Sequence, residues 1–309
     1  MIKKFPEFSN LSSISPKLLI DITDEFEPYS DFNFVSLFSW DTEENTQISL
    51  LGRNLILKMD DYGDNKRFLT FIGDENITNT IDILLNYLKT DSTLQQCLRL
   101  IPKVVVDAIA DSSLFKITED IDNNDYVLST EESIDLPGGK YQNKRKSINR
   151  FVRTYEDSVK IKILELDNKD NHNNIKKLLD KWIQNKGNNE VIIDSDIDAI
   201  NKILKYFSFL KGYCYLECMA IYIDDILVGF CIYELLDNGW AISHFGKCDN
   251  TFLNLYEYMM ISVLRELNSR NYTFLNYEQD LGLPGLRASK SSSIPTKFLY
   301  KYTISSGTK

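Results

Sequence analysis

The sequence predicts an α/β (α+β) protein of two domains, each a mixed, mostly antiparallel sheet flanked by helices. Three observations lead to this fold class. The 309 residues suit one large or two ordinary domains, at roughly 150 residues per domain. Helix-like and strand-like periodicities alternate along the chain, and nearly the same order of elements occurs twice. A break near residues 130–137 then divides the chain into domains 1–135 and 136–309.

The first half begins with a short helix and a group of three strands. Phe34, Leu37 and Phe38 fall at i, i+3 and i+4, the spacing of one helix face. Turn-forming residues then separate three strand-like runs, at 47–51, 54–59 and 67–72. The remaining elements are a helix at 77–89, a strand at 98–101 and a short helix at 104–109.

The second half repeats this order with clearer signals. A strand at 159–166 precedes two helices at 174–186 and 197–210. Three strands follow, at 213–223, 226–236 and 240–247, then a helix at 253–270, a strand at 272–280, a short helix at 284–290 and a last strand at 298–304. Asp224-Asp225 and Asn238-Gly239 join the three strands as tight turns, so an antiparallel meander is expected.

The step from the strand at 240–247 through the following helix to the strand at 272–280 predicts a right-handed parallel crossover. Such a crossover brings the carboxyl ends of two strands side by side, where ligands bind in open α/β sheets. This order of elements is that of the GNAT acyltransferase fold: a strand, two helices, a meander, a helix, a strand, a helix and a strand. Its occurrence twice predicts two tandem GNAT-like domains.

Composition and charge exclude several classes of protein. The contents of 43% apolar and 26% charged residues are those of a globular chain. The net charge, 35 − 45 = −10, disfavours non-specific coating of nucleic acid. Five cysteines without a Cys-x-x-Cys pair, together with two distant histidines, predict no metal site. No stretch of about 18 apolar residues occurs, so we expect a soluble, cytoplasmic protein without a transmembrane segment.

Residues 136–155 contain six cationic residues and no acidic residue, although the chain as a whole is acidic. The cations are Lys140, Lys144, Arg145, Lys146, Arg150 and Arg153. As a helix, this segment places Lys146, Arg150 and Arg153 on one face, opposite an apolar face of Ile148, Phe151, Val152 and Tyr155. The segment is either a solvated helix face or a binding surface for an anionic partner.

A second group of candidates lies where the two crossover strands end. Its members are His244, Lys247, Glu278 and Asp280 on the strands, with Arg287 and Lys290 from the short helix that follows. Acids and bases at the carboxyl ends of strands suit proton transfer. Two plainer interpretations stay open: His244 as a core histidine bonded to a backbone carbonyl, and Arg287 as the ion-pair partner of Asp280.

Four blocks of the sequence are distinctive: DFNFVSLFSW, LPGGKYQNKRKSINRF, HFGKCD and NYEQDLGLPGLRASKSSSIP. These blocks resemble the C-terminal domain family of lysyl-phosphatidylglycerol synthases and their free-standing relatives, and the resemblance extends from about residue 26 to residue 302. The resemblance implies a tandem GNAT fold related to Fem-type enzymes, which move amino acids from aminoacyl-tRNA. In the synthases the acceptor is a lipid hydroxyl.

The chain also departs from these relatives. We expect no counterpart of the membrane region of the full-length synthases, so phosphatidylglycerol is a less favoured acceptor. The turn CDNTFLNLYEY lacks the glycines through which ordinary GNAT enzymes approach the pyrophosphate of coenzyme A. Acyl-CoA is therefore the less favoured donor, and aminoacyl-tRNA is the more favoured one.

The resulting hypothesis is an aminoacyl transferase that acts on a lipid, peptide or small-molecule amine or hydroxyl. Glu278 or Asp280, with His244 as an alternative, accepts the proton of the acceptor, and Lys247 or Arg287 stabilises the oxyanion. The basic helix and Lys290 hold the phosphates of the donor tRNA. An acyl-CoA-dependent N-acyltransferase and a non-catalytic binding module are the alternatives. No cofactor is expected beyond the donor substrate, and the oligomeric state is left open.

Overall fold

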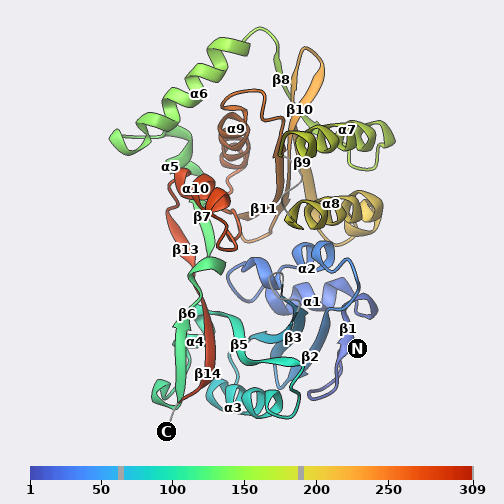
Figure 1. The fold of residues 1–309 in the computed structure, drawn as a ribbon, viewed down its shortest axis with the longest axis vertical. Coiled ribbons are helices and arrows are strands. Elements are labelled where there is room, and N and C mark those ends of the chain that lie inside the picture. Colours follow the sequence, from blue (N-terminus) through green and yellow to red (C-terminus); the bar gives the residue numbers. More distant parts are fainter. Residues whose placement is uncertain (62–65, 187–190, 308–309) are drawn as a thin grey trace. The chain divides into compact units, whose positions relative to one another are not determined.

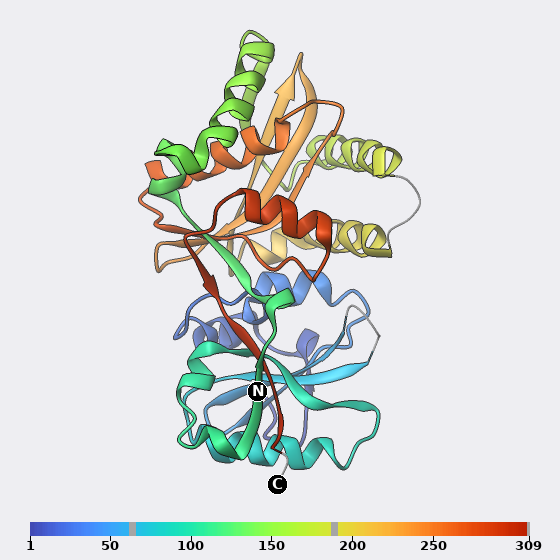
Figure 2. The same cartoon turned by 60° about the vertical axis from the view of Figure 1, so that its left-hand side comes forward.

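The computed structural model describes residues 1–61, 66–186 and 191–307. The chain forms two compact units, each with its own sheet (Figures 1 and 2). Unit 1 comprises Met1–Asp125, Gln279–Leu286 and Phe298–Lys309. Unit 2 comprises Tyr126–Glu278 and Arg287–Lys297. Both C-terminal additions to unit 1 come from the part of the chain that was assigned to the second domain.

Unit 1 contains a sheet in the order β1-β2-β3-β4-β5-β14-β6. The strands are β1 (Ser9–Asn10), β2 (Gln47–Leu51), β3 (Asn54–Asp60), β4 (Arg67–Ile72), β5 (Leu94–Pro102), β6 (Phe115–Glu119) and β14 (Lys301–Ser306). The helices are α1 (Pro16–Thr23), α2 (Phe34–Trp40), α3 (Ile77–Leu88) and α4 (Lys103–Asp107). β4 and β5 are parallel and α3 connects them, while the other pairs are antiparallel. α3 packs its apolar face on the sheet, where Ile81 and Leu84 are fully buried.

Unit 2 contains a sheet in the order β13-β7-β12-β11-β10-β9-β8. The strands are β7 (Asp125–Ser129), β8 (Val159–Leu164), β9 (Tyr215–Ile223), β10 (Ile226–Leu235), β11 (Trp240–Cys248), β12 (Phe274–Asn276) and β13 (Lys297–Leu299). The helices are α5 (Thr130–Asp135), α6 (Gln142–Tyr155), α7 (Lys169–Lys186), α8 (Val191–Leu210), α9 (Leu255–Ser269) and α10 (Pro284–Ser292). α9 covers one face of this sheet and α7 and α8 cover the other (Figures 1 and 2).

Local sequence explains the meander and the crossover of unit 2. Asp224 and Asp225 both adopt positive φ, as does Gly239, so the two turns reverse the chain as predicted. β11 and β12 are parallel, with Trp240 paired with Phe274. Between them α9 buries a stripe of apolar side chains against the sheet. The predicted fold class, two mixed sheets flanked by helices in the GNAT order, is confirmed.

The last strand of each half joins the sheet of the other half. β7 follows β6 along the chain but lies beside β12, and β14 follows β13 but lies beside β5. The sequence predicts a single strand at 298–304 within the second domain. The structure instead has two strands here, β13 in the sheet of unit 2 and β14 in the sheet of unit 1, so this prediction is corrected. The physical reason is that an apolar alternating run specifies a strand but does not specify which open sheet edge that strand will cover.

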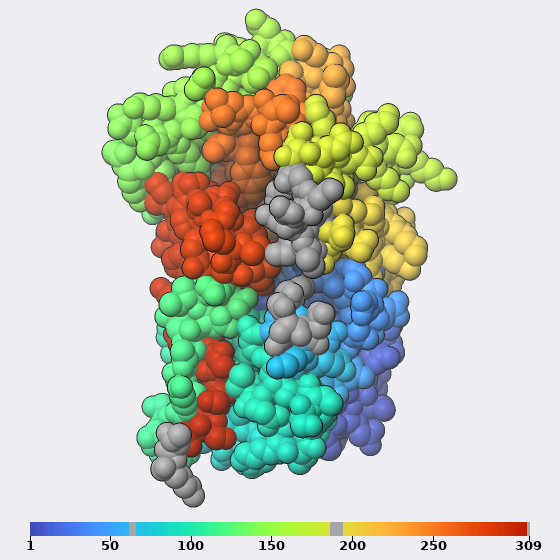
Figure 3. All heavy atoms as spheres, in the orientation of Figure 1, coloured from blue at the N-terminus to red at the C-terminus, as the bar shows by residue number. Residues whose placement is uncertain are grey.

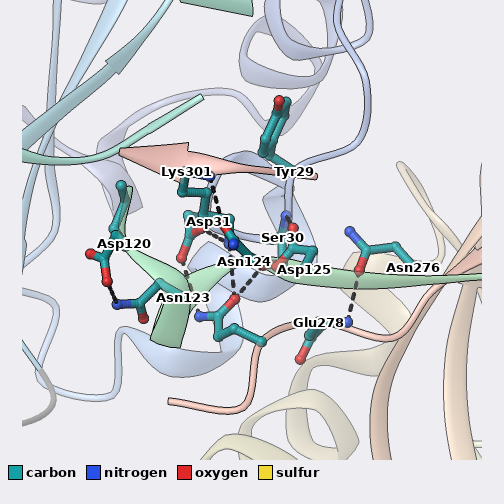
Figure 4. Close-up of polar contacts among 12 residues, drawn as sticks. Tyr29, Ser30, Asp31, Asp120, Asn123, Asn124, Asp125, Asn276, Glu278 and Lys301 are labelled. Carbon is teal, nitrogen blue, oxygen red and sulfur yellow. Dashed lines mark hydrogen bonds and ion pairs between the residues drawn. The ribbon is translucent and has the colours of Figure 1, made fainter. Parts of the chain in front are cut away.

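A buried lysine connects the starts of the two exchanged strands in unit 1 (Figure 4). Lys301 opens β14, and its Nζ donates to Asp125 Oδ1 at 2.7 Å, at the start of β7. The same ammonium pairs with Asp31 and donates to Gln279 Oε1 at 3.0 Å. Burial alone would lower the pKa of Lys301, but Asp125 and Asp31 raise it above its usual value. The group therefore stays charged and cross-links three distant segments of unit 1.

Replacing Lys301 by methionine is expected to destabilise the protein strongly. Lys301→Met leaves the buried carboxylates of Asp31 and Asp125 without their cation, a loss of about 3–5 kcal/mol in the free energy of unfolding. Urea denaturation measures this loss, and Lys116→Met, at an exposed lysine of β6, is the matched control. Adding Asp125→Asn to Lys301→Met should recover part of the loss. A loss below about 1 kcal/mol would show that the cluster is not a structural cross-link.

Candidate active site

His244 occupies an irregular position in β11. The register passes from Ile232↔Phe245 to Tyr233↔Ser243, so β11 carries one extra residue, His244, opposite β10. This is a β-bulge, which bends a strand and redirects a side chain. His244 is buried. The bulge lies two residues beyond the last registered pair of β11 with β12, Ile242↔Asn276.

The His244 imidazole lies between two carboxylates. Its Nδ1 is 3.2 Å from Glu278 Oε1, and its Nε2 is 3.4 Å from Glu234 Oε2 on β10. Burial would lower the pKa of His244, but the hydrogen bonds and charges of Glu234 and Glu278 raise it to about 9. At neutral pH the site therefore contains an imidazolium between two acidic side chains, and we call these three residues the His244 triad.

Glu278 is held in a strained backbone conformation two residues after the end of β12. Its φ of 57° lies in the left-handed region, which costs a residue other than glycine about 1–3 kcal/mol. Asn276 Oδ1 accepts the Glu278 N–H at 2.7 Å (Figure 4), and the Glu278 carbonyl accepts from Tyr126 N at 3.1 Å. Such strain persists where surrounding contacts impose it, commonly at functional sites. The Glu278 side chain is 14% exposed, more than Glu234 at 5%.

The structure brings His244 and Glu278 together, but it places other predicted members elsewhere. Lys247 points toward α7 and α8, with Nζ 4.4 Å from the Trp182 ring centroid and an ion pair to Asp196. Asp280 belongs to unit 1, where its Oδ1 accepts the Gly282 N–H at 2.8 Å. The predicted convergence of Lys247 with His244 is thus corrected, because an opposite charge and an aromatic ring hold the ammonium by the helices.

Two residues on α10 complete the predicted group. Arg287 is partly exposed at the first turns of this helix. Lys290 is buried, its Nζ donates to the Tyr277 carbonyl, and it lies 4.6 Å from the Tyr277 ring centroid. Lys290 therefore supports the backbone just before Glu278, which corrects its predicted role as a phosphate ligand.

The basic segment forms η5 (Gly139–Tyr141) and α6. Lys140, Lys146, Arg150 and Arg153 are exposed, and the segment that contains α6 lies on the surface of unit 2 (Figure 3, light green). Lys144 is buried on the apolar side. Arg145 donates to the carbonyls of Leu136 and Gly138. Lys144 and Arg145 therefore do not belong to the exposed basic face of α6. Lys144 falls at helical spacing with the buried Tyr141 and Ile148, and backbone carbonyls hold Arg145.

Sequence reasoning missed Glu234, which contacts His244, while it placed Asn276 on the same strand face as Glu278 without assigning it a role. A signal for Glu234 was present, because it is the lone carboxylate in the apolar run ILVGFCIYELL, and carboxylates are rarely buried without a partner. Nothing in the sequence indicated that β11 would carry a bulge. The Asn276 side chain accepts a hydrogen bond from the backbone N–H of Glu278, two residues further along the chain. This contact depends on the conformation of the turn, which the sequence does not indicate.

The turn between β11 and α9 is filled by an aspartate. Asp249 is 1% exposed, and its Oδ1 accepts from Thr251 N at 3.0 Å and from Thr251 Oγ1 at 2.7 Å. Its other oxygen pairs with Lys181 of α7. The Asp249 carboxylate therefore satisfies the backbone N–H of Thr251 and adds a negative charge to the loop before α9, which begins at Leu255.

The described residues contain no group of three or more His, Cys, Asp or Glu side chains that could hold a metal ion. Cys231 and Cys248 are buried, and burial raises the pKa of both thiols. These thiols are therefore uncharged at neutral pH and poor metal ligands or nucleophiles. Among the described helices, none has the length and apolar character needed to cross a membrane.

The two mixed sheets, each with a parallel β–α–β step, define the chain as a GNAT-like protein of two sheets, with the His244 triad at the end of one step. A family model described as the C-terminal part of phosphatidylglycerol lysyltransferase matches residues 24–305. Because this match spans most of the chain, the chain belongs to that family. Family and fold support an acyltransferase of the lysyl-phosphatidylglycerol synthase type.

Solved structures of similar fold extend over nearly the whole chain. A Bacteroides thetaiotaomicron protein of unknown function is 23% identical, with a TM-score of 0.77 over 98% of this chain and 99% of that chain. The C-terminal domain of a putative lysylphosphatidylglycerol synthetase from Agrobacterium fabrum is 14% identical, with a TM-score of 0.64 over 97% and 92%. L-PGS of Bacillus licheniformis is 13% identical, with a TM-score of 0.61 over 100% and 95%.

One curated relative is also similar in sequence. An uncharacterised protein of Mycoplasmoides gallisepticum is 27% identical over 186 residues, which are 59% of this chain and 56% of that protein. The match thus spans about half the length of the relative. It adds no activity to the family assignment.

The His244 triad predicts a pH dependence of stability. Because the folded pKa of about 9 exceeds the unfolded value of roughly 6.5, protonation stabilises the fold fully below about pH 6.5 and less as the pH rises toward 9. The free energy of unfolding of the wild type should therefore fall across this window. His244→Gln should remove this part of the pH dependence.

Proton NMR of the imidazole signals checks the same prediction directly. One histidine signal should titrate near pH 9 and disappear in His244→Gln, while His172→Gln, which changes the other histidine of the chain, leaves it in place. A His244 signal that titrates below about 6.5 would mean that the two carboxylates do not hold an imidazolium.

Proposed function

We propose that the protein transfers an aminoacyl group from aminoacyl-tRNA to an amine or hydroxyl acceptor, and that the reaction takes place at the His244 triad of unit 2. The observation that carries this proposal is the strained Glu278, held against a buried imidazolium at the end of two parallel strands. The carboxyl ends of such strands are where GNAT-like and other open sheets bind ligands.

In this mechanism Glu278 is the general base. The acceptor oxygen or nitrogen attacks the ester carbonyl of the donor, and the Glu278 carboxylate takes the proton that the acceptor loses. The resulting acid returns the proton to the ribose oxygen as the tetrahedral intermediate collapses, so atoms and charges balance. General-base assistance of this kind contributes about 10²–10⁴-fold to a rate. Arg287, partly exposed on α10, is the cation assigned to the oxyanion.

His244 and Glu234 are positioning residues for this base. The imidazolium contacts both carboxylates, and Glu234 on β10 offsets most of its charge. Glu278 is therefore oriented by its hydrogen bond to the imidazolium, and Glu234 on the other side of the ring holds the imidazolium in place.

The donor is assigned from two features of unit 2. The Asp249 carboxylate lies in the loop that precedes α9, and its negative charge disfavours an anion such as the pyrophosphate of an acyl-CoA near that helix start. The exposed cations Lys146, Arg150 and Arg153 offer a surface to the phosphates of a tRNA. The family name links lysyl transfer to a lipid hydroxyl, and a lipid, peptide or small-molecule acceptor fits this proposal. We place the reaction in the cytoplasm, where aminoacyl-tRNA is made.

Glu278→Gln is expected to lower the rate of aminoacyl transfer by about 10²–10⁴-fold without unfolding the protein. The amide keeps a hydrogen bond to the triad but cannot accept the proton. A single-turnover assay with total tRNA charged with labelled amino acids, and with phosphatidylglycerol vesicles or small amines as acceptors, measures the transfer. Glu156→Gln, an exposed carboxylate of the same unit, is the control. Transfer at the wild-type rate in Glu278→Gln would refute the role of this base.

Lys146→Glu with Arg150→Glu is expected to weaken tRNA binding and its salt dependence. If each cation neutralises one phosphate, the slope of log K against log salt should become shallower by about 1.4–1.8. Filter binding of uncharged tRNA at several salt concentrations measures this slope. Lys176→Glu with Lys177→Glu, at exposed lysines of α7, is the matched control. An unchanged slope would exclude this face of α6 as the tRNA surface.

A further inference from the structure

Two buried polar side chains at the beginning of α6 have no hydrogen-bond partner within the part of the chain that the structure describes. They are the Lys144 ammonium and the Tyr141 hydroxyl. Lys144 is 8% exposed and Tyr141 is 1% exposed. A buried polar group without a partner is costly, and the cost is greatest for a charged one.

Both side chains lie on the face of the segment that packs against α9. Tyr141, Lys144 and Ile148 are spaced at i, i+3 and i+7, and the cluster around Tyr141 and Ile148 includes Ile261 of α9. Side chains on a helix lean toward its N-terminus, so the Lys144 ammonium extends back toward the turn that contains Tyr141. The two unsatisfied groups therefore lie on the same face, one helical turn apart.

The surroundings of Lys144 offer incomplete compensation for its charge. Burial lowers the pKa of Lys144 to about 8, and Glu257 of α9 opposes this shift. The described ion pairs contain no contact between Lys144 and a carboxylate. Lys140 Nζ lies 4.9 Å from the centroid of the Tyr141 ring, and Arg145 binds the carbonyls of Leu136 and Gly138. Lys140 and Arg145 thus add two cations beside the glycine turn.

The same turn is the open N-terminus of a helical segment. Gly138 has a φ of +76°, and a Cβ at Gly138 or Gly139 would meet no atom within 4 Å. The first turn of α6 carries no acidic residue, and no side chain caps the segment at its start. Backbone N–H groups and the positive end of the helix dipole at such a turn attract anions.

We propose that Tyr141, Lys144 and the glycine turn before α6 form a binding site for a phosphate group, separate from the His244 triad. The ammonium and the phenol hydroxyl each donate to a phosphate oxygen, and the open turn contributes backbone N–H groups. A tetrahedral phosphate has enough acceptor oxygens for donors on several sides, whereas a planar carboxylate has two. The site binds the phosphate of a small molecule, either free phosphate or a phosphate ester.

Thermal denaturation with inorganic phosphate, glycerol 3-phosphate and acetate tests this site. Both phosphate probes should raise the melting temperature of the wild type, with acetate weaker than either at equal ionic strength. A larger shift with inorganic phosphate indicates free phosphate as the ligand, and a larger shift with glycerol 3-phosphate indicates an ester. No shift with either phosphate probe, or tighter binding of acetate, would overturn the proposal.

Lys144→Met gives the sharpest result because two effects point in opposite directions. Removal of an unpaired buried cation should raise the melting temperature without ligand, while phosphate affinity should fall at least about tenfold, since a hydrogen bond to a charged group is lost. Lys176→Met, at an exposed lysine of α7, should change neither quantity. A ligand-free melting temperature well below that of the wild type, with phosphate affinity unchanged, would show that Lys144 is only part of the core.

Tyr141→Phe provides a second variant that preserves the ring and its packing. It should reduce phosphate affinity by less than Lys144→Met does, since it removes a neutral donor. Unchanged affinity in this variant would exclude the hydroxyl from the site. These measurements need no donor or acceptor of a transfer reaction, so failure of the phosphate site is distinguishable from failure of the proposed aminoacyl transfer.

Discussion

The architecture of unit 2 depends on a buried histidine held between two carboxylates. Moving three ionisable groups out of water is costly, and the cost is offset only while all three remain in contact. Glu234 lies on β10, His244 lies at the bulge in β11, and Glu278 lies in the loop that follows β12. The triad therefore constrains three neighbouring strands at once. The parallel pairing of β11 with β12 and the strained turn at Glu278 are the local conditions that keep it assembled.

Unit 1 contains a chemically similar arrangement with a different consequence. Lys301 lies between Asp31 and Asp125, so each unit has one buried cation between two buried or nearly buried carboxylates. Lys301 has its pKa raised and remains charged throughout the physiological range. The Lys301 group is therefore a cross-link where the exchanged strands begin. In the His244 triad the cation titrates near pH 9 and Glu278 is partly exposed, which are properties suited to proton transfer.

The sequence indicated features that depend on neighbouring residues along the chain. The Asp-Asp and Asn-Gly turns predicted the hairpins of β9, β10 and β11, and the helix after β11 predicted the parallel crossover that brings His244 near Glu278. Features set by distant contacts were not accessible. The exchange of β7 and β14 depends on which sheet edge is open, and the inward position of Lys144 became clear only with the packing of α6 on α9. The sequence did contain a signal for this position of Lys144, because it shares a helical face with the apolar residues Tyr141 and Ile148.

The central claim is that the His244 triad is the place where the transferred group reacts. A crystal structure of the protein with a stable amide analogue of a 3′-aminoacyl-adenosine tests it most directly. We expect the amide carbonyl in unit 2 beside Glu278, with room for an acceptor atom within roughly 3 Å of the carboxylate. An analogue seated in unit 1, or in unit 2 away from Glu278, would contradict the claim.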